Sequence, residues 1–456
     1  MKHRKKEYYI AVVLLMSLVP SLGMLWQQKS NANGKEELKG FPQLYTEEDG
    51  WNHTWLSDAG SWFETHFAFR RELITADAKM KSTLQVSAND QVICGSDGWL
   101  YYRDSLADYQ GTERMSQREL FNVSHTLALI QEYAEKKGVA FLFVPVPNKN
   151  SLYGEHMPYY DQVKESDEKN LTALLKELDL EKVHYTDLYP EFAEAGKVLY
   201  HKTDSHWTNE GAAIAADQIL SALEIPHVDY AEETYEVRKD FYGDLEEMLY
   251  PADPRPEEEV YYTRDQNYTY STEETDNFAY KVSTSSDGEG GSLVMYRDSF
   301  CNALLPFLAE SFTEGYFSRG EPYYLDDLDT WQADNLILER AERFLPKMAK
   351  NTAVMAAPER EEVPENSVQI FDGEIRLDSD DEKSEVSYTT SGRYQMLEGS
   401  IPEKFRSDRA KIYAQMNGEC VYEAFPVTLE DGNEWGYRMY LPAQQNQTIH
   451  IKIFLI

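Results

Sequence analysis

An unbroken run of apolar residues, Val139 to Val146, constrains the fold of this chain more than any other segment. It follows Gly138, which ends an expected helix that begins near Ser116 and Glu119, a capping-box pair. A continuous apolar run suits a strand that is buried on both faces, as in a parallel sheet covered by helices. The run therefore predicts an α/β domain.

Strands and helices go on alternating through residues 50–356, which predicts one domain with a mostly parallel sheet. The other expected strands are Val183–Tyr185, Ser292–Tyr296, Gly315–Ser318 and Asn335–Leu338. Residues 226–291 are rich in Tyr, Asp and Glu and are too long for an ordinary loop. We expect either an excursion over the strand ends that lines a substrate groove or an acidic, solvated insertion.

The pattern changes after a charged, proline-bearing linker at residues 357–367. Residues 368–456 alternate apolar and polar side chains with period two, most clearly at Ile449, Ile451, Ile453 and Leu455. Short strands of this kind, separated by turn residues, predict a small β-sandwich. In size and pattern it resembles a carbohydrate-binding module.

The first residues have a different character from the rest of the chain. Basic residues from Lys2 to Lys6 precede an apolar run from Tyr8 to Trp26, which is about long enough to span a bilayer. Because positive charge stays in the cytoplasm, we expect a single-pass membrane anchor at residues 1–26, a polar stalk at 27–49 and an extracytoplasmic body. A cleaved signal peptide is the alternative, although no clean small-x-small cleavage site follows.

Charge and cysteine content exclude several classes of partner. The formal net charge of −36 makes nucleic acid unsuitable, because phosphate would be repelled. Three cysteines are an odd number, which excludes a disulfide framework as the main stabiliser but leaves one bridge open. They are also too few for a thiolate metal site. We expect neither a metal nor a cofactor, in a protein of the bacterial cell surface.

The segment around Asp204 and His206 is the main candidate for chemistry. A carboxylate two residues from an imidazole can orient a general base, and Ser299, at the expected end of a strand, can supply the hydroxyl. The alternatives are helix capping and core packing. A metal site made of His201, Asp204 and His206 is a weaker interpretation, and Cys301 is a weaker candidate for the nucleophile than Ser299.

Five segments in order resemble the DHHW family, which is similar to the SGNH-hydrolase-like O-acetyltransferases of alginate and other exopolysaccharides. The segments are Gly95–Tyr101, Val144–Lys149 with Leu152 and Tyr153, Leu199–Ala212, Phe241–Leu245 and Leu338–Arg343. Together they cover roughly residues 50 to 350. The resemblance implies a flavodoxin-like, circularly permuted SGNH fold, in which the aspartate and histidine precede the serine.

By this resemblance Ser299 is the nucleophile, His206 the general base and Asp204 the residue that orients it. Four further residues are candidates for substrate binding: Trp207, Lys149, Tyr153 and Arg297. Core packing is the alternative for Trp207 and Tyr153. The sequence departs from the family at Arg297, which stands where a glycine is usual, and at Ser205, in place of the commoner Thr or His.

The resemblance implies an extracytoplasmic O-acetyltransferase that forms an acyl-serine intermediate and acetylates a cell-surface or exported polysaccharide. A membrane-bound O-acyltransferase is the implied donor partner. An acetylesterase with the same three residues is one alternative, and a non-catalytic protein that binds glycan or serves as a scaffold is another.

Overall fold

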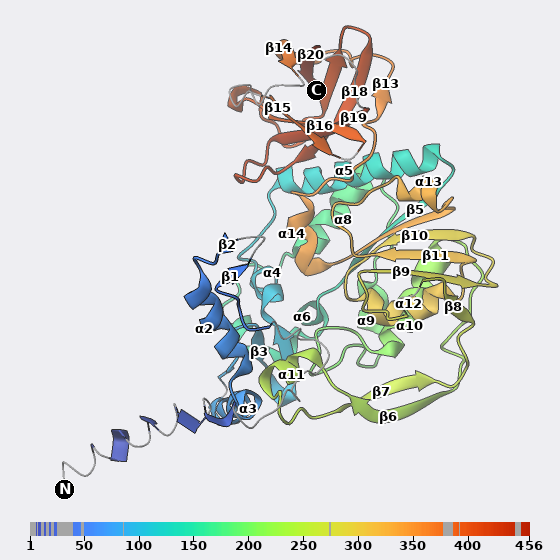
Figure 1. The fold of residues 1–456 in the computed structure, drawn as a ribbon. Helices are drawn as coiled ribbons and strands as arrows, with labels where there is room; N and C mark the ends of the chain where they lie inside the picture. Colours follow the sequence, from blue (N-terminus) through green and yellow to red (C-terminus); the bar gives the residue numbers. More distant parts are fainter. Residues whose placement is uncertain are drawn as a thin grey trace. The chain divides into compact units, whose positions relative to one another are not determined.

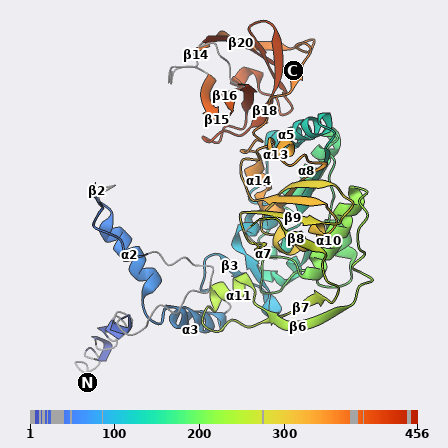
Figure 2. The ribbon, with the colours of Figure 1, turned by 45° about the vertical axis from the view of Figure 1, so that its right-hand side comes forward.

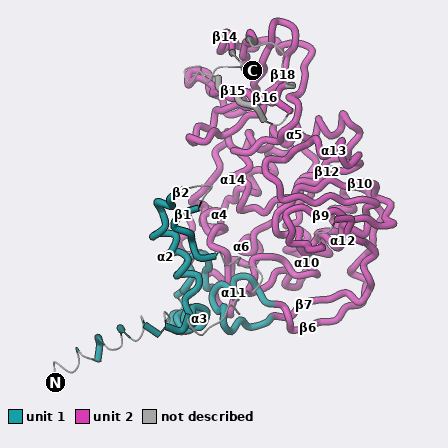
Figure 3. Tube along the Cα trace, viewed as in Figure 1, with its two compact units in different colours: residues 1–94, 242–256 teal, residues 95–241, 257–456 magenta. Residues whose placement is uncertain are grey.

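The chain divides into two units in the computed structural model: residues 1–94 with 242–256, and residues 95–241 with 257–456 (Figure 3). The structure describes short pieces of the first 24 residues and then residues 40–46, 50–84, 86–272, 275–376, 386–391, 393–442 and 448–456. The expected anchor and stalk fall largely outside these ranges. No helix among the described residues is both long and apolar enough to cross a membrane.

Unit 1 joins two stretches that lie far apart in the sequence. Its elements are β1 (Tyr45–Thr46), β2 (Gly50–Trp51), α2 (Trp55–His66), α3 (Arg70–Ser82), β3 (Val92–Cys94) and α11 (Asp244–Leu249). Phe69, with a φ of 63°, separates α2 from α3. The Thr75 hydroxyl of α3 accepts the N–H of Ala252 at 3.0 Å, which holds the second stretch against the first.

The central sheet of unit 2 has the strand order β5-β12-β10-β11-β9-β8 (Figure 1). Its strands are β5 (Ala140–Val146), β12 (Asn335–Ala341), β10 (Ser292–Tyr296), β11 (Glu314–Ser318), β9 (Lys281–Ser286) and β8 (Tyr268–Tyr270). The first four are parallel, as the sequence predicts. β9 and β8 are antiparallel, so the sheet is mixed. The expected strand Val183–Tyr185 is only a single bridge from Tyr185 to Phe143.

Helices cover both faces of this sheet. Val294 and Tyr296 of β10 pack with α5 (Gln117–Lys136) and α8 (Asn170–Glu181). Leu293 and Met295 of the same strand pack with α10 (Asn209–Ala222) and α12 (Cys301–Ala309). Alternate side chains of a strand point to opposite faces, so a strand in this position must be apolar throughout. This accounts for the apolar run over residues 139–146.

Shorter elements connect these layers. They are η1 (Ser96–Gly98), β4 (Leu100–Tyr102), η2 (Arg103–Ser105), α4 (Leu106–Gln110), α6 (Lys149–Leu152), η3 (Gly154–His156), α7 (Pro158–Asp161), α9 (Tyr189–Glu194), α13 (Asp327–Thr330), η4 (Glu342–Phe344) and α14 (Leu345–Met348). An antiparallel hairpin of β6 (Tyr235–Phe241) and β7 (Glu257–Tyr262) also belongs to unit 2. The segment 226–291, expected as an excursion, thus supplies this hairpin and two strands of the central sheet.

The C-terminal domain is an antiparallel β domain, as the period-two pattern predicts. Its elements are β13 (Glu359–Arg360), β14 (Val368–Arg376), β15 (Val386–Ser391), β16 (Tyr394–Ser400), η5 (Glu403–Phe405), β17 (Ile412–Met416), β18 (Cys420–Val427), β19 (Gly436–Pro442) and β20 (Thr448–Leu455). The strands form one hydrogen-bonded path, β14-β20-β17-β18-β19-β16-β15, with β13 beside β18. The antiparallel pairing agrees with the expected β domain, and the sandwich arrangement itself stays a prediction.

Helix α5 carries the contacts to this domain, which lies beyond it in both views (Figures 1 and 2). Arg118 of α5 is fully buried and donates to the carbonyl oxygens of Asp408 at 3.3 Å and Ala410 at 2.9 Å. His125 of the same helix lies between the carboxylates of Glu181 and Glu423, 2.8 Å from each.

Arg360 of β13 extends this network. Its guanidinium donates to Glu423 at 2.8 Å and to Glu132 of α5 at 2.6 Å. We call His125, Glu132, Glu181, Arg360 and Glu423 the ionic seam. Residue 360 lies within the expected linker, so this part of the linker is fixed between α5 and β18.

Candidate active site

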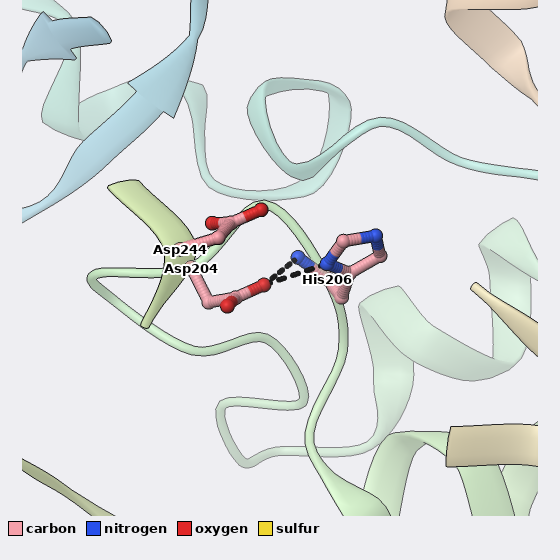
Figure 4. Close-up of side chains that lie close together, drawn as sticks. All are labelled: Asp204, His206 and Asp244. Carbon is pink, nitrogen blue, oxygen red and sulfur yellow. Dashed lines mark hydrogen bonds and ion pairs between the residues drawn. The ribbon is translucent and has the colours of Figure 1, made fainter. Parts of the chain in front are cut away.

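The structure brings Asp204, His206 and Ser299 together. His206 Nδ1 lies 2.7 Å from Asp204 Oδ1, and His206 Nε2 lies 2.7 Å from Ser299 Oγ. The backbone N–H of His206 also donates to Asp204 Oδ1 at 2.9 Å (Figure 4). Asp244, also drawn in Figure 4, belongs to unit 1. A carboxylate, an imidazole and a hydroxyl in this order can activate the hydroxyl as a nucleophile.

A narrow loop between α9 and α10 positions the first two residues. The N–H of Thr208 donates to the Leu199 carbonyl at 2.8 Å, and the N–H of His201 donates to the His206 carbonyl at 3.2 Å. The Thr208 side chain then caps α10 by accepting the N–H of Gly211. Asp204 lies at the tip of this loop and is 5% exposed.

Lys149 holds the tip of the loop from the inside. Its buried ammonium donates to the carbonyl oxygens of His201 and Lys202 at 2.9 Å and of Asp204 at 2.7 Å. It also lies over the rings of Trp99 and Tyr101. The predicted role of Lys149 in substrate binding does not fit, because all three of these acceptors belong to the protein backbone.

Two glutamates of β7 hold the same loop from the outside, and the sequence analysis missed both. Glu257 accepts the N–H groups of Lys202 at 2.8 Å and Thr203 at 2.6 Å. Glu259 accepts from the His201 side chain at 2.9 Å and from the N–H of Asn209 at 3.2 Å. One sequence signal was available. Glu257 and Glu259 are two positions apart, which puts both side chains on the same face of a strand.

The His201 side chain contacts residues other than Asp204 and His206, the two residues with which it would form a metal site. Its ring is stacked on Phe241 at 3.8 Å and is hydrogen-bonded to Glu259. The side chain is 2% exposed. It helps to anchor the β6–β7 hairpin against the loop that carries Asp204.

The turn that presents Ser299 is fixed by Asp298. The Asp298 carboxylate accepts the N–H of Phe300 at 2.9 Å and the N–H of Ala341 at 2.8 Å, and its own N–H donates to Glu339 at 2.8 Å. Burial raises the pKa of Glu339 well above its usual range, and the Asp298 charge adds to the effect. Burial opposes ionisation of Asp298 too, but Arg343 and the Glu339 carboxyl lower its pKa overall. The two pKa shifts thus run in opposite directions, with the negative charge favoured on Asp298.

The backbone at this turn offers a free donor. The N–H of Ser299 has no hydrogen-bond partner among the residues that the structure describes, and α12 begins two positions later. A helix N-terminus favours negative charge, so this N–H suits an oxyanion. The side-chain amide of Asn148 is buried without a partner in the described part of the chain.

The structure corrects two other predicted substrate contacts. Trp207 is 1% exposed, and its indole N–H donates to the Phe300 carbonyl at 3.0 Å. Arg297 is equally buried and donates to the carbonyl oxygens of Asn277 and Ala279 at 2.8 and 2.9 Å. Both side chains are held by the protein, so Trp207 offers no face to a sugar, and Arg297 is tied to the backbone while it also lines a cavity beside Ser299.

Tyr153 and Cys301 also have structural contacts. The Tyr153 hydroxyl accepts the N–H of Leu199 at 2.9 Å, and its ring packs against Trp99. Cys301 is fully buried against Met295, and burial raises the pKa of its thiol. Ser299 is therefore a better candidate nucleophile than Cys301.

A cavity of about 280 Å³ adjoins Ser299. Its charged lining residues are Arg297, Asp298, Arg319, Glu321, Arg340 and Lys347. Tyr323, Phe344 and Met348 supply its apolar wall. The cavity can hold a group several times larger than an acetyl unit.

Residues 92–284 match the family model described as the SGNH hydrolase-like domain of the acetyltransferase AlgX. This part of the chain is thus similar to an SGNH hydrolase-like domain. The match includes Asp204 and His206 and ends before Ser299. The position of Ser299 in the site therefore rests on the geometry of the structure.

Curated relatives show the same similarity. The chain is 25% identical over 205 residues to the "Probable alginate O-acetylase AlgJ" of Pseudomonas fluorescens, covering 42% of this chain and 49% of the relative. It is 26% identical over 195 residues to the protein of the same name from Pseudomonas syringae pv. tomato, covering 38% and 43%. The chain thus spans about half the length of the curated relatives that it matches.

A solved DHHW family protein from Eubacterium siraeum is also similar. It is 19% identical and has a TM-score of 0.41, with 51% of this chain and 90% of that chain covered. A likeness this distant carries no conclusion about function.

Proposed function

We propose that this chain is an O-acetyltransferase that acylates hydroxyl groups of an exported or cell-surface polysaccharide. The observation that carries the proposal is the hydrogen-bonded series from Asp204 through His206 to Ser299. The similarity of residues 92–284 to the AlgX domain is a second support. Relatives named as alginate O-acetylases support a polysaccharide as the acceptor.

The reaction has two balanced steps. First, Ser299 Oγ gives its proton to His206 Nε2 and attacks the acyl carbonyl of the donor; the leaving group departs with that proton, and an acyl-serine ester remains. Second, a sugar hydroxyl gives its proton to His206 and attacks the ester. Ser299 Oγ leaves and takes the proton back. Asp204 keeps Nδ1 protonated and stabilises the imidazolium in both steps.

The oxyanion of each step lies at the unpartnered N–H of Ser299. The same proposal includes a circularly permuted SGNH order, because the histidine and aspartate precede the serine in the chain. It also includes a membrane anchor at residues 1–26, an extracytoplasmic body and a membrane-bound O-acyltransferase as the acyl donor. The C-terminal β domain is proposed to bind the polysaccharide.

Hydrolysis of an ester is the second candidate function. The side chain of His206 is 23% exposed, so water can reach its Nε2 side and replace the sugar hydroxyl. An acetylesterase and a transferase would then share the first step and differ in the acceptor.

The test uses Ser299→Ala in the full chain with 4-nitrophenyl acetate, alone and with oligosaccharide acceptors. We expect the variant to lose nitrophenol release by at least about a thousandfold. Ser292→Ala, at the opposite end of β10, is the matched control and should retain the activity. Acetylated oligosaccharide as product supports transfer, and acetate alone supports hydrolysis. If wild type and Ser299→Ala are equally inactive, the chain is a non-catalytic glycan-binding or scaffold protein.

A further inference from the structure

The cavity beside Ser299 has an unusual balance of charge for this chain. The protein has a formal net charge of −36, yet four of the six charged residues that line the cavity are basic. The two acidic ones are Asp298 and Glu321. The Asp298 carboxylate accepts two backbone N–H groups, and its charge offsets part of the positive charge of Arg319 and Arg340.

The basic groups are only partly compensated. Arg340 is 2% exposed and has one carboxylate partner, Glu321, at 2.7 Å. The Glu321 side chain itself is 49% exposed. Among the described residues, Arg319 and Lys347 have no carboxylate partner. In the described part of the chain, two cations on the cavity wall therefore have no carboxylate within ion-pair distance.

Buried hydrogen-bond donors without a partner also indicate that the cavity suits an anion. The Nε atoms of Arg319 and Arg340 are buried and have no hydrogen-bond partner in the described part of the chain. A buried donor without a partner costs free energy, more so when the group is charged. Burial lowers the pKa of the Arg319 guanidinium, and the charge of Arg297 lowers it further. An anion in the cavity would relieve both effects.

Carboxylate is the anion that best fits this wall. The planar guanidinium matches a carboxylate with two parallel hydrogen bonds. Glu321 Oε1 already lies 2.7 Å from Arg340 Nη2 as an ion pair, so a carboxylate can reach this wall. The volume of about 280 Å³ leaves room for a group attached to the reacting ester.

We propose that the cavity is a carboxylate subsite for a substrate that reacts at Ser299. Arg319 and Lys347 bind the carboxylate directly, and Arg340 supports it from the buried side of the wall. The inference rests on the proposed function and narrows its substrate class. The carboxylate belongs either to a uronic acid unit of the acceptor or to the far end of a dicarboxylic acyl group.

The experiment compares matched acidic and neutral substrates in the full chain. Oligogalacturonate and its methyl ester, with 4-nitrophenyl acetate as donor, test the acceptor. The half-ester 4-nitrophenyl succinate and its methyl ester test the acyl group.

We expect wild type to prefer the acidic member of one pair by about tenfold. Arg319→Gln and Lys347→Gln should each reduce that preference to within about twofold. Lys350→Gln removes an exposed charge outside the cavity lining and should leave the preference unchanged.

Binding to Ser299→Ala by calorimetry separates this inference from the proposed function. If wild type turns over acidic and neutral members equally, and Ser299→Ala binds them equally, the carboxylate subsite is wrong and the acyltransferase proposal stands. If no ester reacts but Ser299→Ala binds oligogalacturonate or succinate better than its methyl ester, and Lys347→Gln removes the difference, the subsite stands and the catalytic proposal fails.

Discussion

Trp207 donates its indole N–H to the Phe300 carbonyl at 3.0 Å. Trp207 directly follows His206 in the chain and Phe300 directly follows Ser299, and His206 and Ser299 are hydrogen-bonded to each other. The two contacts join the same pair of segments, which lie 93 positions apart in the chain. The hydrogen bond between Trp207 and Phe300 lies among buried apolar side chains. It therefore holds the two segments in the alignment that the hydrogen bond between His206 and Ser299 requires. The tryptophan is thus a positioning residue for the imidazole and the hydroxyl.

Trp207→Phe should keep the aromatic packing and remove this one hydrogen bond. We expect kcat for 4-nitrophenyl acetate to fall by about five- to tenfold, since a neutral hydrogen bond contributes about 1 kcal/mol. Trp331→Phe, which changes a half-buried tryptophan stacked on Tyr316, is the control. Equal rates in wild type and Trp207→Phe would show that the contact does not align the site.

Glu257→Ala should slow the reaction without unfolding the chain. The change removes the acceptor for the N–H groups of Lys202 and Thr203, so the loop that carries Asp204 loses its outer support. We expect kcat to fall by at least about tenfold. Glu258→Ala changes the exposed neighbour on the other face of β7 and should behave as wild type. A similar loss in both variants would contradict the assignment.

Lys149→Met should affect stability as well as rate. Three carbonyl oxygens lose a charged donor and stay buried, which should lower the free energy of unfolding by about 3 kcal/mol or more in urea titrations. Lys202→Met, an exposed lysine on the same loop, should change it by less than about 0.5 kcal/mol. If Lys149→Met is as stable as wild type, the lysine does not hold the loop.

The ionic seam predicts a loss of stability in acid. Burial alone would raise the pKa of Glu181, but His125 and nearby cations lower it to about 2. Glu132 behaves alike, as Arg360 and Lys136 outweigh burial and lower its pKa to about 2. Both values lie below the ordinary 4.5, so the unfolded chain binds more protons between these limits. The contribution is complete above about pH 5 and is lost as the pH falls toward 2.

Thermal unfolding of wild type and Glu181→Gln between pH 7 and pH 3 checks this. The melting temperature of wild type should fall more steeply below pH 5 than that of the variant, because the variant has one titrating group fewer. Parallel curves would mean that the seam adds nothing to the pH dependence.

Much of the central domain could be predicted because its signals are local. The apolar run at 139–146, the capping box at Ser116 and the cap at Thr208 each depend on neighbouring residues, and each is present in the structure. The spacing of Asp204 and His206 was equally local. Their approach to Ser299 was expected from the family resemblance and the usual position of ligands at strand ends.

The rest depended on contacts that one sequence does not display. β9 has a single apolar residue, Val282, so its pairing with β11 gave no apolar signal. Burial of Trp207, Lys149 and Arg297 could not be read from residue types that also bind sugars and anions.

Strand β12 is the last strand of the central sheet in the chain, yet it lies between β5 and β10. Synthesis runs from the N-terminus to the C-terminus. The growing chain therefore contains Asp204, His206 and Ser299 before it contains residues 335–341, which lie between β5 and β10 in the sheet. Until that segment emerges, the β10 end that presents Ser299 has no neighbour on one side and Asp298 lacks the backbone of Ala341. The sheet edge that presents Ser299 is therefore complete only with residues 335–341, the last of its strands in chain order.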